Sequence, residues 1–343
     1  MKQIGWAFWA VLLAASVNAN DTTVSNRAFS VGLWGDQFYS DDAQIRAQRA
    51  QQTVDSINAH DVAFTLFTGD TKNGHLPCTD KAIGEDVSNV FNALNMPTIY
   101  SLGDNEWTDC HRTSNGGYDP LERLAYLRKT FFSQALSQGR VPLPLHRQAL
   151  AEGILSENSR YVKNDVAFVA LSIPGSNNNF VATQKQCKKA SQRSSEDCER
   201  ANAEYRARNA RNMAWLKAAF EEARRYQYAG VVVLIQADIF FPYELSDGGF
   251  KKDFLPGLDD NNGFTDFYLT LQHETQHFDG QVLLVHGDSH FFKMDKPMYD
   301  PDGRLTANFT RVQVFGEEDN SWVKLLVEPD TDSVFTLQPV ILR

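Results

Sequence analysis

Four apolar runs in this chain end in the same pair of residues, a glycine followed by an aspartate. The four pairs are Gly35-Asp36, Gly69-Asp70, Gly103-Asp104 and Gly287-Asp288. One such pair is typical of a strand-to-helix turn in which the aspartate caps the helix. Four carboxylates that converge at one edge of a sheet would instead need a cation, because buried like charges require a partner. The repetition therefore indicates a metal site.

The chemistry is densest between residues 103 and 111, where carboxylate, amide and imidazole groups follow one another closely. The side chains are those of Asp104, Asn105, Glu106, Asp109 and His111. Polar groups at the carboxyl end of a buried strand lie where open α/β sheets place their functional sites. We therefore expect this turn to lie at the centre of the site.

The elements that must position these turns alternate between strands and helices. We expect strands over 29–34, 62–68, 98–102 and 231–235, another that ends at His286, and helices over about 42–59, 84–95 and 196–225. The run 231–235 is continuously apolar, which is typical of a strand buried on both faces. A hairpin is expected over 161–172, whereas 136–160 has an irregular pattern. This alternation predicts an α/β fold.

The order of these motifs resembles that of the calcineurin-like metallophosphoesterases. The matching stretches are Asp36-Gln37-Phe38, Gly69-Asp70, Gly103-Asp104-Asn105-Glu106, Gln236 after its strand, and Gly287-Asp288-Ser289-His290. The resemblance covers most of residues 29–325. It implies a four-layer α/β fold, in which two packed mixed β-sheets are flanked by helices, and one domain over 20–343. It also implies two divalent metal ions and metal-dependent hydrolysis of a small phosphorylated substrate, a phosphate mono- or diester.

The resemblance assigns the ligands residue by residue, and several of them depart from the family pattern. The implied metal ligands are Asp36, Asp70, Asp104, Gln236, Asp288 and His290. Only Asp36, Asp70 and His290 match the family pattern, while Phe38 replaces a histidine ligand. Because three of the substitutions supply oxygen donors, we interpret the site as retuned rather than inactive. One imidazole and five oxygen donors favour Mn²⁺, Mg²⁺ or Ca²⁺, while Zn²⁺ and Fe are possible.

Two residues are expected to act on the substrate itself. Asn105 stands where the family has a histidine that assists the leaving group. Its amide can donate a hydrogen bond to phosphate, but it cannot act as a general acid. His286 is expected to point the same way as Asp288, two residues further along, and could restore the acid. His111 is an alternative for this role, and His286, His111 or His75 could supply a missing imidazole.

The first residues and the cysteines predict an exported protein, periplasmic or secreted. Lys2 and the apolar run 4–17 before Ala19 form a signal peptide over 1–19, which is too short to span a membrane. The four cysteines are an even number, as in disulfide-bonded exported proteins. Their positions relative to the turns predict the pairs Cys78–Cys110 and Cys187–Cys198.

The net charge argues against one class of function, and two alternative hypotheses remain open. The net charge of −10 argues against a nucleic-acid surface, which would be basic. The first alternative is a catalytically inactive module on the same scaffold, which binds metal or phosphate without turnover. The second is a structural calcium site, to which the acidic stretch 258–263 would be suited although it lacks the spacing of an EF-hand.

Overall fold

The computed structural model describes residues 27–150, 155–240 and 261–342. The predicted signal peptide and most of the acidic stretch 258–263 lie outside these residues. Within the part of the chain that is described, no helix combines the length and the apolar character needed to cross a membrane.

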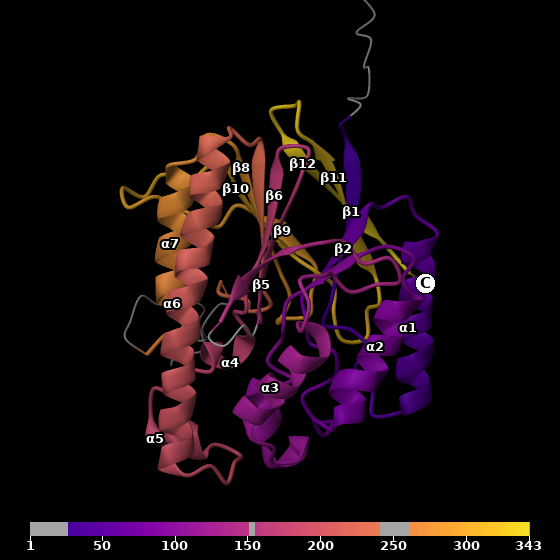
Figure 1. Ribbon diagram of the computed structural model, residues 1–343, viewed down its shortest axis with the longest axis vertical. Helices are drawn as coiled ribbons and strands as arrows, with labels where there is room; N and C mark the ends of the chain where they lie inside the picture. Colours follow the sequence, from indigo (N-terminus) through magenta and orange to yellow (C-terminus); the bar gives the residue numbers. More distant parts are fainter. Residues whose placement is uncertain (1–26, 151–154, 241–260, 343) are drawn as a thin grey trace, which may run out of the picture.

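Two mixed β-sheets form the centre of the molecule (Figure 1). The five-stranded sheet has the order β12-β11-β1-β2-β3, with β1, β2 and β3 parallel. Its strands are β1 (Phe29–Trp34), β2 (Phe64–Phe67), β3 (Thr98–Tyr100), β11 (Trp322–Glu328) and β12 (Val334–Val340). The seven-stranded sheet has the order β4-β5-β6-β7-β8-β10-β9, with β6, β7, β8 and β10 parallel. Its strands are β4 (His146–Ala149), β5 (Leu155–Lys163), β6 (Val166–Ala170), β7 (Gly230–Leu234), β8 (Gln281–His286), β9 (Lys293–Asp295) and β10 (Phe309–Gln313).

Helices cover the outer face of each sheet and complete the four layers of the expected fold, which is confirmed (Figure 1). The helices are α1 (Ala43–Asn58), α2 (Asp86–Ala93), α3 (Pro120–Phe131), α4 (Gly175–Asn178), α5 (Gln184–Lys188), α6 (Ser195–Arg225) and α7 (Thr265–Gln276). Shorter helical turns span Lys81–Glu85, Thr108–His111 and Thr113–Asn115. Helices α1, α2 and α3 pack on the five-stranded sheet, whereas α6 and α7 pack on the seven-stranded sheet.

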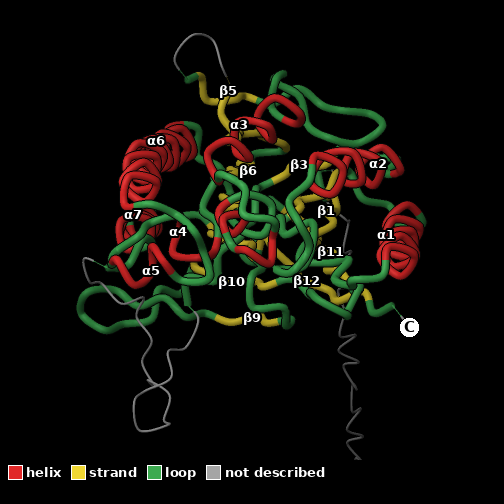
Figure 2. Tube along the Cα trace, turned by 90° about the horizontal axis from the view of Figure 1, so that it is seen from below, coloured by secondary structure: helices red, strands yellow, loops and turns green. Residues whose placement is uncertain are grey.

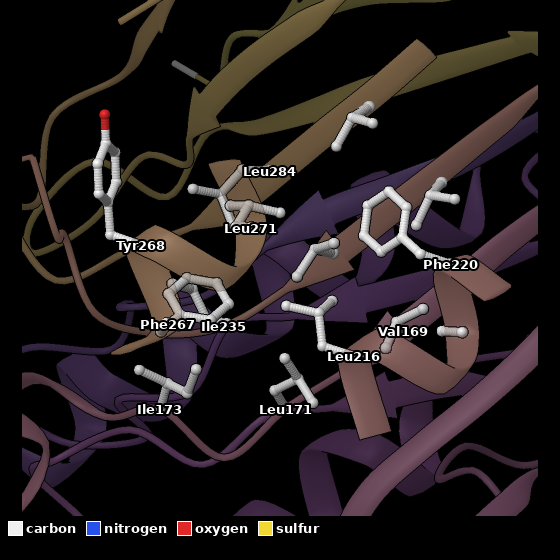
Figure 3. Close-up of a cluster of buried hydrophobic side chains, with 14 of the residues drawn as sticks. Val169, Leu171, Ile173, Leu216, Phe220, Ile235, Phe267, Tyr268, Leu271 and Leu284 are labelled. Atoms are coloured by element: carbon white, nitrogen blue, oxygen red, sulfur yellow. The ribbon is translucent and has the colours of Figure 1, made fainter. Parts of the chain in front are cut away.

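The alternation of side chains along β7 shows how the layers are held together. Val231, Val233 and Ile235 face Leu216 and Phe220 of α6 in one apolar cluster (Figure 3). Their neighbours Val232 and Leu234 face the other way and pack between the two sheets. The strand is therefore buried on both faces, which is the reason for its continuous apolar sequence.

Aspartates cap the first turns of two helices, while two expectations from the sequence are wrong. Asp42 accepts hydrogen bonds from the amides of residues 44 and 45 at the start of α1, and Asp119 caps α3. The segment 136–160 is not irregular throughout, because it contains β4 and most of β5. The strand β4 has a mixed exposed and buried pattern at the edge of the sheet, so periodicity alone does not reveal it. Ile45, an apolar position of the expected helix, is 41% exposed, unlike Val54 and Ile57.

Both predicted disulfides are confirmed. Cys78 is bonded to Cys110, with a sequence separation of 32, and Cys187 is bonded to Cys198, with a separation of 11. The first bond joins the loop after β2 to the loop after β3, which are the two loops that carry Asp70 and Asp104. The second closes the short segment between α5 and the first turn of α6.

We expect the two disulfides to contribute unequally to stability, because the entropy lost by the unfolded chain grows with the length of the closed loop. Replacement of Cys78 and Cys110 by alanine should lower the free energy of unfolding by about 3–4 kcal/mol. The same change at Cys187 and Cys198 should lower it by about 2–3 kcal/mol. Urea denaturation of both double variants measures this difference, and a larger loss for the 187–198 pair would contradict the expectation.

Candidate metal centre

The loops that follow the parallel strands of both sheets meet at one end of the molecule. Asp36 follows β1, Asp70 follows β2 and Asp104 follows β3, whereas Gln236 and Asp288 follow β7 and β8 of the other sheet. Figure 2, seen from below, shows loops gathered between α1 and α2 on one side and α6 and α7 on the other. A hydrogen bond of 2.6 Å from the amide of Asp288 to Oδ1 of Asp36 joins the two groups of loops.

Asp36, Asp70 and His290 form the tightest group of metal-binding side chains. Among the residues that the structure describes, one ligand atom from each of these three side chains lies within 4.8 Å of the other two. Asp36 is fully buried and also accepts a hydrogen bond of 2.8 Å from the hydroxyl of Thr68. Nε2 of His290 is buried without a hydrogen-bond partner among the described atoms and lies 3.9 Å from Oδ1 of Asp36. This unpartnered nitrogen beside two carboxylates fits a divalent cation.

Asp70 is held by a second set of donors. Its Oδ2 accepts hydrogen bonds from the hydroxyl of Tyr39 at 2.7 Å and from Nδ2 of Asn105 at 2.8 Å. Its Oδ1 accepts the backbone amide of Asn105 at 3.2 Å. The predicted catalytic amide therefore lies against the central carboxylate, and Tyr39 is a site residue that the motif comparison missed.

Asp104 and Asp288 approach each other around Gly175. A Cβ atom at Gly175 would lie 2.6 Å from Oδ1 of Asp288 and 2.8 Å from Oδ2 of Asp104, so only glycine fits between them. The hydroxyl of Ser176 donates to Oδ2 of Asp104 at 2.7 Å. Asp288 accepts the backbone amide of Asp238 at 3.0 Å. These two carboxylates form the part of the site that could hold a second cation with Asp70.

The side-chain amide of Gln236 is engaged in hydrogen bonds at both its oxygen and its nitrogen. Its side-chain oxygen accepts the backbone amide of Gly175, and its Nε2 donates to Oδ1 of Asp288 at 3.3 Å. In this arrangement the side chain positions Gly175 and Asp288. An oxygen ligand from Gln236 would require its amide to turn and these hydrogen bonds to break.

Glu106 joins the turns after β2 and β3 through hydrogen bonds to their backbone amides. Its Oε1 accepts the amide of Gly103 at 2.7 Å, the hydroxyl of Tyr100 at 2.9 Å and the amide of Asp70 at 3.3 Å. Its carboxylate is fully buried. Glu106 thus fixes the backbones that carry Asp70 and Asp104, a role that its place in the acidic stretch does not by itself reveal.

Two features of the aspartate turns are unusual, namely the backbone conformation of the aspartates and the close packing against the glycines. Positive φ angles occur at Asp36 (53°), Asp70 (56°) and Asp288 (78°), a conformation that clusters at functional sites. A Cβ at Gly287 would lie 1.7 Å from Oδ2 of Asp36. A Cβ at Gly103 would lie 2.1 Å from Oδ1 of Asp70. Glycine is needed at these positions because the aspartate of another pair packs against them.

The expected imidazoles are not brought together. His286 is fully buried, with Nδ1 3.0 Å from the carbonyl of Gly287, and it does not line the pocket around Asp70. Burial lowers the pKa of His286 to about 4. The left-handed backbone at Asp288 turns that side chain out of the strand, so the two side chains do not share a direction as expected. His111 lies 2.6 Å from the carbonyl of Thr108, and burial also lowers its pKa to about 4. His75, in contrast, is exposed and lines the pocket.

The electrostatics of the carboxylates follow from burial and from their proximity. Burial raises the pKa of Asp36 and of Asp70 well above the ordinary value, and neighbouring carboxylates raise each further. Burial, followed by the charge of Asp104, raises the pKa of Asp288 to about 8. Such groups are ionised at neutral pH only if a cation offsets their charge. The site is therefore built for cations, and it opens into a pocket of about 780 Å³.

Comparisons with known proteins find similarity in the fold. No family model matches the chain, and no curated protein matches it by sequence. A dimetal phosphatase from Danio rerio is 11% identical, with a TM-score of 0.44 over 92% of this chain and 99% of that protein. A 5'-nucleotidase from Candida albicans is 9% identical, with a TM-score of 0.43 over 92% of this chain and 51% of that one. The sulfate thiohydrolase SoxB from Thermus thermophilus is 14% identical, with a TM-score of 0.39 over 88% of this chain and 41% of that one.

This chain therefore spans about half or less of the nucleotidase and of SoxB, and nearly all of the phosphatase. Because every TM-score is below 0.5, the function is argued below from the site residues.

We expect chelator-treated protein to lose stability as the pH rises. The folded-state pKa of Asp288 is about 8 and that of the ordinary group is 3.8, so the folded chain binds more protons than the unfolded chain between these values. The stabilisation is therefore complete below about pH 4 and is lost as the pH rises through about 8. Urea denaturation at about pH 5 and pH 8 measures the loss, which Mn²⁺ should reduce.

Two variants control this measurement. Asp288→Asn removes one of the raised groups and should reduce the dependence of stability on pH. Asp302→Asn changes an exposed carboxylate and should leave it as in the wild type. A chelated protein that becomes more stable between about pH 5 and pH 8 would contradict the expectation.

Proposed function

We propose that this chain is a metal-dependent phosphoesterase that hydrolyses a small phosphate mono- or diester by a metal-activated water. The observation that carries the proposal is the convergence of Asp36, Asp70 and His290 within 4.8 Å. The buried carboxylate of Asp104 and the partly exposed carboxylate of Asp288 lie beside this group. Structural support for a metal-dependent hydrolase thus comes from the donor set and from its place at the strand ends.

The residues of the site would have separate roles in binding the metal ions, binding the phosphate and donating a proton. Asp36, Asp70 and His290 would hold one cation, and Asp70, Asp104 and Asp288 would hold a second. When bound, the cations supply Lewis acidity and lower the pKa of a bound water. The amide of Asn105, fixed by Asp70, would donate a hydrogen bond to a phosphate oxygen at the mouth of the site. His75 is an exposed imidazole that lines the same pocket, and it would protonate the leaving group.

The alternative is a catalytically inactive module that binds metal or phosphate with the same residues. Two observations favour it. Asn105 cannot donate a proton, and the side-chain oxygen of Gln236 is already engaged by Gly175. Hydrolysis of 4-nitrophenyl phosphate in the presence of Mn²⁺ separates the two functions, because a binding module releases no 4-nitrophenol above background.

Export is the second part of the proposal. Cleavage after Ala19 would leave one domain over 20–343, and both disulfides suit an oxidising compartment. Mass spectrometry of the protein isolated from its native host should find a mature N-terminus at residue 20 and no free thiols.

We expect Asp70→Asn to reduce phosphate release by more than about a hundredfold, because this carboxylate is the ligand that both cations would share. Far-ultraviolet circular dichroism should show an unchanged fold. Asp302→Asn, which changes an exposed aspartate away from the pocket in the same way, is the matched control. Wild-type turnover in the Asp70 variant would place the chemistry elsewhere.

We expect Mn²⁺ or Mg²⁺ to support several-fold more activity than Zn²⁺, because the donor set has one imidazole among carboxylate oxygens. The measurement is phosphate release by chelator-treated protein after addition of one metal at a time, together with the metal content of protein purified without chelator. Full activity with stoichiometric Zn²⁺ alone would contradict this expectation and would indicate that a further imidazole, such as that of His75, is a ligand.

A further inference from the structure

A groove, formed by two neighbouring cavities, adjoins the pocket around Asp70 and Asp104, which is here called the metal pocket. Asp109, Arg112 and Ser176 line both the metal pocket and a neighbouring cavity of about 250 Å³. That cavity shares His111 and Arg193 with a third cavity of about 400 Å³. The three hollows therefore adjoin one another, and a substrate that is longer than one phosphate group could extend from the metal pocket toward the groove.

The walls of this groove are held in place by both disulfides. One wall is the segment 108–117, which is tied to the loop after β2 through Cys110. The other wall is the segment 188–194, which lies between Cys187 and Cys198. A backbone hydrogen bond of 2.9 Å from the amide of Thr113 to the carbonyl of Ala190 connects the two walls. The groove is thus a preformed feature, which lowers the entropic cost of binding.

The charge of the groove differs from that of the rest of the metal pocket. Arg112, Lys189 and Arg193 line it. Arg112 is paired with Asp109 at 2.7 Å. Within the described residues, neither Lys189 nor Arg193 forms a salt bridge, and Nε of Arg193 is buried without a hydrogen-bond partner.

Two acidic groups of the third cavity are paired with another arginine, although the charges of Asp109 and Asp197 also act on Arg193, and the opposite rim is acidic. Asp119 and Asp197, which line the third cavity, both accept a hydrogen bond from Arg200. The rim of the metal pocket away from the groove carries Asp41, Glu317 and Glu318. An anionic substituent would therefore be repelled from that rim and attracted toward Lys189 and Arg193.

We propose that the groove is a subsite for a second phosphate group, so that the preferred substrates are phosphate esters of an alcohol that itself carries a phosphate. This inference rests on the proposed function. Water forms the new bond to phosphorus at the metal pocket, and the bond from phosphorus to the alcohol oxygen breaks. One proton of the water ends on the alcohol and the other on the released phosphate. The alcohol leaves with its second phosphate held by Arg193 and Lys189, while Arg112 stands between the two positions.

The test compares short α,ω-alkanediol bisphosphates with the monoalkyl phosphates of the same chain length, with Mn²⁺ present and phosphate release as the readout. The wild type should show a kcat/KM for the best bisphosphate at least about tenfold higher, after correction for its two equivalent ends, because a charged hydrogen bond contributes that much. Arg193→Gln and Lys189→Gln should each reduce this ratio, and the double variant should bring it close to one.

Two further variants make the result specific. Arg193→Lys keeps the charge and should keep most of the preference, which a merely structural role of Arg193 would not predict. Lys185→Gln removes a charge from the same region of the chain but from an exposed residue that does not line the groove, and it should leave the ratio unchanged. Hydrolysis of both esters with a ratio near one, or a ratio that the variants do not change, would overturn the subsite and leave the proposed function intact.

Binding separates this failure from a failure of the proposed function. Calorimetry would measure the affinities of an alkane bisphosphonate and of the matching alkylphosphonate, which cannot be hydrolysed, for the Mn²⁺-loaded protein. If neither ester is hydrolysed but the bisphosphonate binds about tenfold more tightly, and Arg193→Gln removes this difference, the subsite is supported without catalysis. Equal affinities for the two phosphonates would overturn it.

Discussion

The repulsion between buried carboxylates is the constraint on which the rest of this end of the molecule depends. Asp36 and Asp70 are buried and Asp288 is partly exposed, and each raises the pKa of at least one neighbour. Every such carboxylate is surrounded by hydrogen-bond donors, among them the hydroxyls of Thr68 and Tyr39. These donors fix positions but do not supply a positive charge. Only cations, or protons on the carboxylates themselves, can offset this negative charge.

The convergence of the carboxylates also constrains the backbone. Carboxylates can converge this closely only if the chain offers no side chain between them, and the glycine of one Gly-Asp pair accepts the aspartate of another. The turns then interlock, with Asp36 against Gly287 and Asp70 against Gly103. Because Gly287 follows a strand of one sheet and Asp36 a strand of the other, the site also connects the two sheets. Formation of the metal centre and packing of the sheets are therefore coupled.

Local chemistry made part of this predictable from the sequence. The caps at Asp42 and Asp119 and the strand before each Gly-Asp pair depend on neighbours in sequence, and both disulfides follow from the positions of the cysteines relative to the turns. The direction of Asp288 relative to His286 was not predictable, since alternation along a strand cannot anticipate the left-handed backbone at Asp288. The role of Gln236 was also hidden, because its amide is engaged by Gly175, a residue 61 positions away.

Phe38 stands where the resemblance to the calcineurin-like metallophosphoesterases implies a histidine ligand, and it does not line the pocket around Asp70. Phe38 has φ of 71°, so its turn retains the left-handed conformation seen at the neighbouring Asp36. Its ring lies in the apolar cluster, 6.1 Å from the ring of Trp34, rather than in the pocket. His290 is then the imidazole of the cluster, placed by Glu317 at 3.2 Å from its Nδ1 and by the edge of Tyr39. A site with one positioned imidazole and several carboxylates gains its affinity mainly from charge, which favours hard cations and phosphate-bearing ligands over neutral ones.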